Sequence, residues 1–476
     1  MKPIISLFQT PNGYYFFDAN KDEVVSIGEE AFEYLNMLLS SDEPDVLSMP
    51  NELLRLKEQG YLKTESSVSK IQHIYSNNLD FYLNRKLSYV ILQLTQDCNL
   101  RCKYCIYSEE HNSFQRSHSK KNMSWDTIKI ALKFLKDHSV DSHETRIGFY
   151  GGEPLLEFEL LQKTVSYSKE FFAGKELAFN MTTNGTLLTD EIILFCEEHE
   201  FSMMISLDGP KEINDFNRVF EDGTGTFDTV AERIERIKEI APNYLPKVGI
   251  SMVINPENDF DCINELCMDD SEFRKLTVQP SLVDRNYGGE EVEFSRQYIW
   301  KNEYQHFLAL LSHYNKCSSD AVSPIAAIWM KKIIDDYPKI DNASALHETD
   351  APSGPCVPGK MRLFINVDGM FYPCERVSEM SEAMCIGSLK DGFNHRAAQN
   401  MLNVGVLTES ECKKCWCFRH CGTCVKKADD GSNALSKNVK LSNCDEMLSS
   451  AYSKIQQYLL LKEIPLFYPK QIRGDK

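Results

Sequence analysis

The sequence predicts an α/β protein that has a parallel sheet or partial barrel at its centre. Apolar, strand-like segments alternate with helical patterns over residues 86–285. Three cysteines directly follow the first of these segments, and a larger group of cysteines lies in residues 351–450. Residues 1–80 have a pattern of their own. We therefore expect a central α/β unit with a small module before it and a cysteine-rich region after it.

Length and composition narrow the class of protein. The 476 residues suggest two or three domains. No run of about 18 apolar residues occurs, and residues 1–6 lack the features of a secretion signal, so we expect a cytoplasmic protein with no membrane partner. The net charge of −18 disfavours nucleic acid as a partner. Sixteen cysteines in such a chain indicate metal ligands or reduced thiols and not disulfides.

The N-terminal 80 residues predict a small sheet followed by helices. Residues 4–8 and 14–17 flank a Pro-Asn-Gly turn and form a plausible hairpin, and residues 24–27 predict a third strand. Helical patterns follow over residues 29–39 and 51–59.

The first cysteine set consists of Cys98, Cys102 and Cys105, in the loop after the apolar strand at residues 89–94. Three thiolates at this C-x3-C-x2-C spacing can hold three corners of a four-iron cluster and leave one iron open. Loops that follow strands are also where barrel proteins build their active sites. The alternative is half of a zinc site, although zinc motifs usually contain two C-x2-C pairs.

With an aromatic residue, Tyr104, before its last cysteine, this motif resembles that of the radical S-adenosylmethionine (SAM) enzymes. The resemblance implies a partial (β/α)6 barrel of TIM type and a 4Fe-4S cluster whose open iron binds the amino and carboxylate groups of SAM. It also implies reduction by a carrier such as flavodoxin or ferredoxin. Cleavage of SAM then gives a 5′-deoxyadenosyl radical that takes a hydrogen atom from the substrate.

Later strands end in residues that the resemblance assigns to SAM. Gly-Gly-Glu-Pro follows the strand at residues 146–150; alone it is often just a turn, but here it is similar to the glycine-rich strand that binds the SAM amino group. Polar residues at the ends of the strands at 177–183 and 202–207 can contact the ribose or carboxylate. Arg218 aligns with an arginine that binds the SAM carboxylate, although the usual histidine is Asn214 here; a surface salt bridge is the alternative. The expected SAM contacts are Tyr104, Gly151, Gly152, Glu153, Asn184, Ser206, Asp208 and Arg218.

Two more strands are expected at residues 247–254 and 276–283, and then a largely helical connector over residues 286–350. Apolar stripes at residues 299–300 and 307–311 predict the core of this connector. The remaining isolated cysteines lack ligand spacing and are expected to be simple thiols: Cys196, Cys262, Cys267 and Cys317.

The cysteine-rich region contains a G-x4-C element, Gly369 to Cys374, and five cysteines within the thirteen residues 412–424. This pattern resembles the SPASM extension of radical SAM enzymes, which holds two auxiliary iron–sulfur clusters. The resemblance implies two 4Fe-4S clusters. One is on an outer cysteine set, Cys412, Cys415, Cys421 and Cys444; the other is on an inner cysteine set, Cys356, Cys374 and Cys424.

The fourth inner ligand stays open between Cys385, Cys417 and no protein residue. Two residues separate Cys421 and Cys424 where the family commonly has three. Structural zinc is an alternative use of these cysteines, and a docking role without electron transfer is another. A C-terminal helix and tail are expected over residues 451–476.

Taken together, these features resemble the radical SAM/SPASM maturases of ribosomally made peptides (RiPPs), and among them the ranthipeptide-type enzymes that make thioether crosslinks. The resemblance implies that residues 1–80 form a winged-helix-like element, whose sheet edge binds the leader of a cysteine-rich precursor peptide; a simple packing cap is the alternative. Formylglycine formation, as in anaerobic sulfatase-maturating enzymes, keeps the same fold. Peptide carbon–carbon cyclisation, epimerisation and a non-catalytic zinc-rich peptide-binding protein remain further alternatives.

Overall fold

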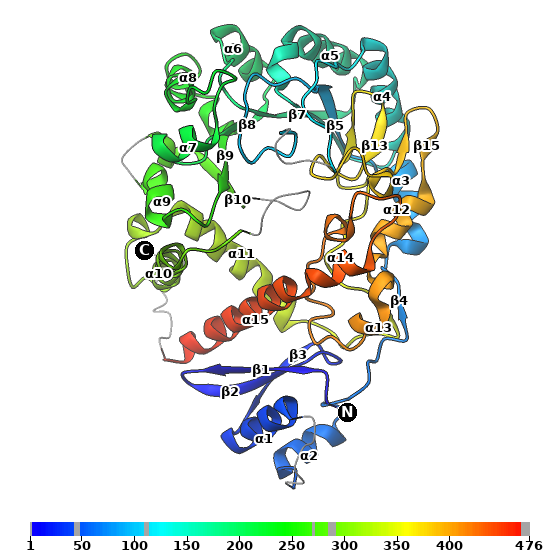
Figure 1. Ribbon diagram of the computed structural model, residues 1–476, viewed down its shortest axis with the longest axis vertical. Helices are drawn as coiled ribbons and strands as arrows, with labels where there is room; N and C mark the ends of the chain where they lie inside the picture. The colour runs from blue at the N-terminus through cyan, green and yellow to red at the C-terminus, as the bar shows by residue number, and fades with distance from the viewer. Residues whose placement is uncertain (1, 42–47, 109–113, 269–271, 284–291, 468–476) are drawn as a thin grey trace.

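A mixed sheet lies at the centre of the protein. The computed structural model describes residues 2–41, 48–108, 114–268, 272–283 and 292–467. In this part of the chain the sheet has ten strands in the order β10-β9-β8-β7-β6-β5-β12-β13-β14-β15 (Figure 1). The predicted α/β fold with a partial barrel is therefore confirmed.

The first six strands of this order are parallel and follow one another along the sequence, as the alternating pattern predicted. They are β5 (Tyr89–Thr95), β6 (Glu144–Gly151), β7 (Glu176–Thr183), β8 (Ser202–Ser206), β9 (Val248–Ile254) and β10 (Thr277–Leu282). The helices between them are α4 (Trp125–His138), α5 (Phe158–Phe171), α6 (Asp190–Glu198), α7 (Lys211–Asn217), α8 (Phe227–Ile240) and α9 (Phe260–Met268).

Local signals explain where several helices begin. The Ser124 hydroxyl accepts a hydrogen bond from Thr127 N at the start of α4, and Thr189 does the same for Ile192 N in α6. β5 has no polar face because the barrel interior and the surrounding helices cover both sides, and six of its seven residues are buried.

The cysteine-rich region extends the barrel sheet instead of forming a detached unit. β12 (Leu363–Ile365) pairs in parallel with β5, and β13 (Met370–Tyr372), β14 (Gly387–Ser388) and β15 (Gly392–Phe393) continue as antiparallel strands. The buried Gln93 of β5 fixes this junction, because its amide donates to Glu379 Oε1 at 2.6 Å and accepts from Val367 N at 3.1 Å.

Helices fill the connector as predicted, but one expected core face is exposed. α10 (Arg296–His313) and α11 (Pro324–Asp341) pack against each other. The side chains of Ile299, Trp300 and Phe307 are 43%, 70% and 53% exposed. The prediction that these apolar stripes form core is therefore wrong for these residues, because α10 packs through its other side, which includes the buried Ala309.

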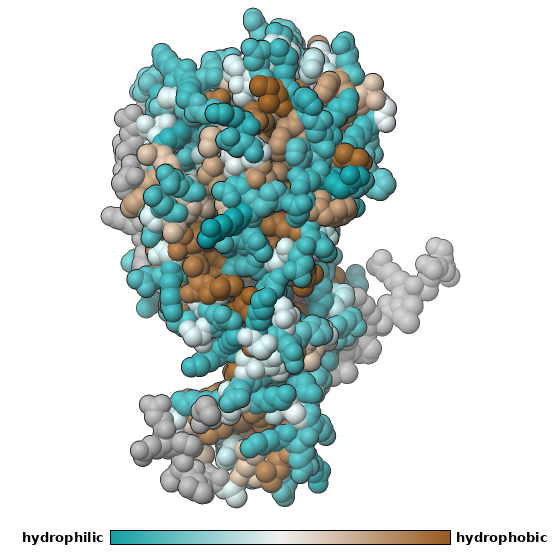
Figure 2. All heavy atoms as spheres, turned by 90° about the vertical axis from the view of Figure 1, so that its right-hand side faces the viewer, coloured by the Kyte–Doolittle hydropathy of each residue, from teal (hydrophilic) through white to brown (hydrophobic). Residues whose placement is uncertain are grey.

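The N-terminal elements match their prediction. β1 (Ile5–Thr10), β2 (Gly13–Asp18) and β3 (Glu23–Ile27) form an antiparallel sheet, and α1 (Glu29–Ser40) and α2 (Asn51–Glu58) cover one face. Figure 2 shows this part as the narrower lower lobe of the molecule. Among the described residues β3 pairs only with β2, so its other edge has no strand partner.

The second face of this small sheet packs on the C-terminal part of the chain. Phe8 and Phe17, both 1% exposed, contact Trp416 and the last helix, α15 (Cys444–Phe467), where Ile455 is fully buried. Burying such a side chain is worth about 1.5–3 kcal/mol. One face of the N-terminal sheet thus packs in the core that supports the cysteine-rich region.

Polar contacts strengthen the same interface. Asp22, 2% exposed, accepts from Arg419 at 3.0 Å and pairs with His420 Nε2 at 3.0 Å. The short strands β4 (Lys70–Ile71) and β11 (Thr349–Asp350) pair beside it, and Arg419 also donates to Asp350. Arg419 and His420 lie in the loop between Cys415 and Cys421, so the N-terminal sheet directly holds the loop of the outer cysteine set.

The remaining helices are α3 (Leu79–Arg85), before β5, and three short helices of the cysteine-rich region: α12 (His395–Leu402), α13 (Glu409–Cys412) and α14 (Lys437–Ser442). A search of the described residues found no helix with the length and apolar character needed to cross a membrane. The predicted tail after residue 467 lies outside the described residues.

Candidate active site

One cavity of about 300 Å³ opens at the carboxyl ends of the parallel strands. It brings together the first cysteine set and all but one of the residues predicted to contact SAM. The predicted residues that line it are Cys98, Cys102, Cys105, Tyr104, Gly151, Gly152, Glu153, Asn184, Ser206 and Arg218.

The first cysteine set sits in a compact loop. Arg101 Nη1 donates to the carbonyls of Cys98 and Leu100, at 2.7 and 2.9 Å, and Cys105 N donates to Cys102 O at 3.1 Å. Burial raises the pKa of Cys98 to about 12 and that of Cys102 to about 11. These thiols therefore stay protonated near neutral pH unless a cation at the site favours the thiolate.

No group of three or more His, Cys, Asp or Glu side chains in the described parts of the chain is arranged to hold a single metal ion. The three thiols instead line the wall of the shared cavity.

Gly151 and Gly152 are required by close packing of the chain on itself. Gly151 has φ +141°, and a Cβ there would lie 2.3 Å from the carbonyl oxygen of Thr95. A Cβ on Gly152 would lie 1.8 Å from the carbonyl oxygen of Asp97. Gly152 N and Glu153 N donate to these same two carbonyls at 2.9 and 2.8 Å. The glycines thus press the end of β6 against the residues that lead into Cys98.

Glu153 is a buried carboxylate at the edge of the cavity. It accepts hydrogen bonds from Thr183 Oγ1 and Asn184 N, both at 2.7 Å, and from Leu155 N at 3.1 Å. Burial raises its pKa, whereas these donors and Arg218 act in the opposite direction. Asn184 in turn donates to Asn99 Oδ1 at 2.8 Å, which ties the end of β7 to the cysteine loop.

Arg218 is buried, 7% exposed, so the alternative of a surface salt bridge is wrong. Its Nη1 donates to the Tyr104 hydroxyl at 2.5 Å, and Tyr104 donates to Asp208 Oδ2 at 2.6 Å. Burial alone would lower the pKa of Arg218, but Tyr104, Cys102 and Asp208 raise it well above its usual value. Asp208 is the one predicted contact that does not line the cavity; it accepts the hydrogen bond of the Tyr104 hydroxyl and so holds Tyr104 in place.

Arg218 still has one unused donor. Its Nε is buried and has no hydrogen-bond partner among the described residues. A buried guanidinium donor without a partner is costly. The cavity therefore fits a ligand that brings an acceptor such as a carboxylate to this position.

Residues from distant parts of the chain, which the sequence did not predict, complete the cavity. Glu375, Arg376 and Lys426 reach it from the cysteine-rich region. Glu375 and Arg376 directly follow Cys374 of the inner set, and Lys426 lies two residues after Cys424, so proximity in sequence to those ligands was the available signal. The other missed residues include His118, Tyr150, Thr182, Thr183, Ser251 and Ser281.

The three cysteines of the inner set lie near one another. Burial, Glu375 and the thiols of Cys424 and Cys356 all raise the pKa of Cys374, to about 12. Burial and the Cys424 thiol likewise raise the pKa of Cys356.

The four cysteines of the outer set also lie near one another. The thiols of Cys412, Cys415 and Cys421 all act on Cys444, whose pKa is raised chiefly by burial.

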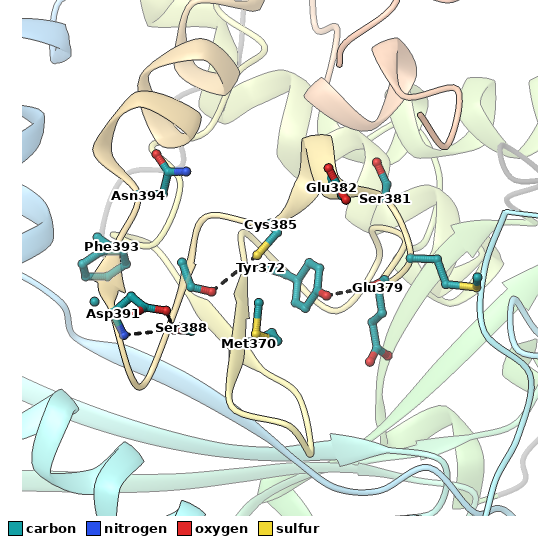
Figure 3. A pocket seen from close by; sticks show the side chains of 13 residues that line it. Met370, Tyr372, Glu379, Ser381, Glu382, Cys385, Ser388, Asp391, Phe393 and Asn394 are labelled. Atoms are coloured by element: carbon teal, nitrogen blue, oxygen red, sulfur yellow. Dashed lines mark hydrogen bonds between the residues drawn. The ribbon is translucent and has the colours of Figure 1, made fainter. Parts of the chain in front are cut away.

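The two candidates for a fourth inner ligand lie elsewhere. Cys417, 1% exposed, hydrogen-bonds to Cys415 and Cys421 and so belongs with the outer set. Cys385 lines a separate cavity of about 630 Å³ with Tyr372 and Phe393, and its thiol donates to Gly387 O at 3.4 Å (Figure 3). The thiols that most affect the inner set are its own members: Cys424 acts on Cys356, and Cys424 and Cys356 act on Cys374.

This fold and site define an α/β enzyme with a cysteine-lined cavity at the mouth of a partial barrel. A model of the radical SAM superfamily matches residues 92–266. An uncharacterised protein of Methanocaldococcus jannaschii is 31% identical over 306 residues, which cover 64% of this chain and 90% of that protein. The chain belongs to the radical SAM superfamily.

Anaerobic sulfatase-maturating enzymes are similar over more of the chain. The cysteine-type enzyme of Clostridium novyi is 24% identical over 393 residues, covering 78% of this chain and 96% of the enzyme. The solved structure described as "Native anSMEcpe with bound AdoMet and Kp18Cys peptide" shares the fold, with a TM-score of 0.55 and 20% identity over 80% of this chain and 98% of that one. The protein is thus a radical SAM enzyme that is similar in sequence to these maturases and shares their fold.

Family membership implies SAM and a first 4Fe-4S cluster, and the cavity fits both. Three thiols provide the soft ligands that iron–sulfur clusters use, and the unpaired Nε of Arg218 suits a carboxylate. When bound, SAM and the cluster supply a 5′-deoxyadenosyl radical for hydrogen abstraction. The protein's own part is to orient the ligand and to exclude water from it.

We predict that Cys98→Ala, Cys102→Ala and Cys105→Ala each abolish the release of 5′-deoxyadenosine from SAM in the presence of dithionite. Each removes one of only three thiols in the first set, whereas the outer and inner sets keep their own. Chromatography of the products, with iron analysis, measures the effect. Cys262→Ala, at an exposed thiol on α9, is the matched control. Undiminished release from any of the three variants would contradict the assignment of this loop.

Proposed function

We propose that the protein is a radical SAM maturase that installs intramolecular thioether crosslinks in a ribosomally made, cysteine-rich peptide. One observation carries this proposal: the first cysteine set and residues beside the inner cysteine set line the same cavity. A substrate held next to Cys374 and Cys424 would lie next to the bound SAM. Bond formation between a thiol and a carbon radical needs this kind of proximity.

Glu375 is the residue we propose to receive the substrate thiol's proton. Its Oε1 accepts from Arg362 at 2.8 Å, while its Oε2 is buried and has no hydrogen-bond partner among the described residues. An unpaired carboxylate oxygen in a cavity can accept a hydrogen bond from a thiol or hydroxyl group.

The reaction balances with the groups proposed. Formation of a C–S bond from a C–H and an S–H group removes two hydrogens from the peptide. One leaves as a hydrogen atom on 5′-deoxyadenosine; the other leaves as a proton, to Glu375, and an electron. The electron needs an acceptor, and the auxiliary clusters proposed for the inner and outer sets would provide one.

The N-terminal sheet supports the choice of a peptide substrate. The outer edge of β3 has no strand partner among the described residues and can accept an extended segment of a leader peptide. Because the sheet also packs on Trp416, deletion of residues 1–80 would damage the cysteine-rich region, so point variants of β3 test this role better than truncation does.

Formylglycine formation is a second candidate function, favoured by the similarity to sulfatase-maturating enzymes of both the cysteine type and the serine type. It would use the same cavity and the same base, with a single cysteine or serine as the target. The mass of the product, the reactivity of its cysteine and a test for an aldehyde together separate these two functions.

We expect co-expression with a cysteine-rich peptide encoded beside the gene to give a peptide that has lost two hydrogens per crosslink and a cysteine that no longer reacts with alkylating agents. Mass spectrometry measures both. Loss of the cysteine sulfur with formation of an aldehyde would establish formylglycine formation instead. Loss of two hydrogens with a reactive cysteine would indicate formylglycine formation from serine if the product contains an aldehyde, and carbon–carbon cyclisation if it does not. An unchanged mass with altered stereochemistry would indicate epimerisation.

We expect proline at one of two adjacent β3 positions, Val24 or Val25, to weaken leader binding without loss of stability. Neighbouring N–H groups of a strand point to opposite edges, so one proline removes an outward donor and the other breaks the pairing with β2. Fluorescence anisotropy of a labelled leader, with thermal unfolding of both variants, gives the result. If the variant that keeps wild-type stability also binds the leader with wild-type affinity, the N-terminal sheet acts only in packing and does not bind the leader.

We further predict that the inner set takes its fourth ligand from the substrate cysteine. Cys385→Ala and Cys417→Ala should both leave the inner cluster intact in the resting enzyme, because the thiols that most affect Cys356 and Cys374 are members of the inner set itself. Addition of the peptide should change the cluster's spectrum, while a peptide with serine in place of cysteine should not. Cys356→Ala identifies the signal of the inner cluster. If Cys385→Ala or Cys417→Ala converts or removes this cluster, the cysteine replaced in that variant is the fourth ligand.

A further inference from the structure

Lys440 is a buried lysine beside the outer cysteine set. It lies on α14, is 4% exposed, and donates to the hydroxyl of Thr408 and, at 3.5 Å, to the thiol of Cys412. The Thr408 hydroxyl is itself 3.1 Å from the Cys412 sulfur. Lys440, Thr408 and Cys412 thus form one buried hydrogen-bonded group.

The charge of Lys440 reaches the whole outer set. Its ammonium group favours the thiolate forms of Cys415, Cys421 and Cys444 as well. The α14 helix also fixes its position relative to the ligands, because Cys444 follows Lys440 by four residues and its thiol contacts the Lys440 carbonyl at 4.0 Å.

A buried ammonium group needs a negative partner. Among the described residues, no carboxylate pairs with Lys440, and its polar partners are the hydroxyl and the thiol named above. Neither the hydroxyl of Thr408 nor a protonated thiol can balance its charge. Four thiolates on an iron–sulfur cluster can, because such a cluster with its ligands is an anion.

We propose that Lys440 is the counter-ion of an iron–sulfur cluster on the outer cysteine set and that it raises the reduction potential of that cluster. A positive charge next to the ligands stabilises the reduced, more negative state more than the oxidised state. Hydrogen bonds to ligand sulfur act in the same direction. Lys440 would thus make the outer cluster a better electron acceptor than the same cluster would be without this charge.

This inference rests on the auxiliary clusters of the proposed function, and the experiment separates the two. Anaerobically reconstituted full-length enzyme is titrated potentiometrically and followed by electron paramagnetic resonance, with Cys444→Ala used to identify the signal of the outer cluster. If every signal of the wild type remains in Cys444→Ala, the outer cluster does not exist, and the proposed function loses this part.

Lys440→Met is expected to lower the reduction potential of the outer cluster alone, and Lys440→Arg is expected to restore it, because arginine keeps the charge. Lys437→Met is the matched control: Lys437 lies on the same helix but is 47% exposed and pairs with Glu411, so its loss should leave all potentials unchanged. Thr408→Val, which removes the bridging hydroxyl and keeps the ammonium group, should give a smaller shift of the same sign.

An unchanged potential in Lys440→Met, or an equal shift of all the clusters, overturns the proposal. If Lys440→Met fails to hold the outer cluster, iron content decides. Retention of the cluster in Lys440→Arg supports the role of the charge, because arginine keeps the positive charge and methionine does not. Loss in both variants assigns Lys440 to packing and overturns the proposal.

Discussion

The pairing of β5 on both of its edges is the constraint on which the rest of the structure depends. β6 lies on one side, and its Gly151 and Gly152 pack against the carbonyls of Thr95 and Asp97. β12 lies on the other side and begins the sheet of the cysteine-rich region. The first cysteine set follows this strand directly, so two walls of the cavity are fixed relative to the same short loop.

Buried charge is concentrated around the cysteines. Beside the first set, Arg218 donates to Tyr104, which in turn donates to Asp208, and Lys440 lies beside the outer set. Charges away from water are costly unless they have partners. The Nε of Arg218 has no hydrogen-bond partner among the described residues, and Lys440 donates to the sulfur of Cys412, so a bound anionic group at each site would partner these cations.

The N-terminal sheet supports the cysteine-rich region, and the same sheet is where we propose that the leader peptide binds. One face of the sheet carries α1 and α2, the other packs on Trp416 and α15, and Asp22 binds Arg419 and His420 in the loop of the outer set. Asp22 directly precedes β3, so a segment paired to β3 would have one of its ends beside Asp22. This proximity gives a direct physical route by which an occupied sheet edge could affect the outer cysteine set.

The sequence alone determined the features that depend on near neighbours. Alternating and apolar runs predicted the strands of the barrel, and a short cysteine spacing predicted the first set, because these patterns act within a few residues. The inner and outer sets were implied by the resemblance to the SPASM extension, since their members are far apart in the sequence. The tertiary structure decided what depends on contacts between distant segments. It brought Glu375, Arg376 and Lys426 to the SAM cavity, separated Cys385 and Cys417 from the inner set, joined β12 to β5 and exposed Trp300. Helical periodicity marks an apolar face but does not say which side of α10 meets the core, and a cysteine's spacing does not say which fold of the chain brings a partner to it.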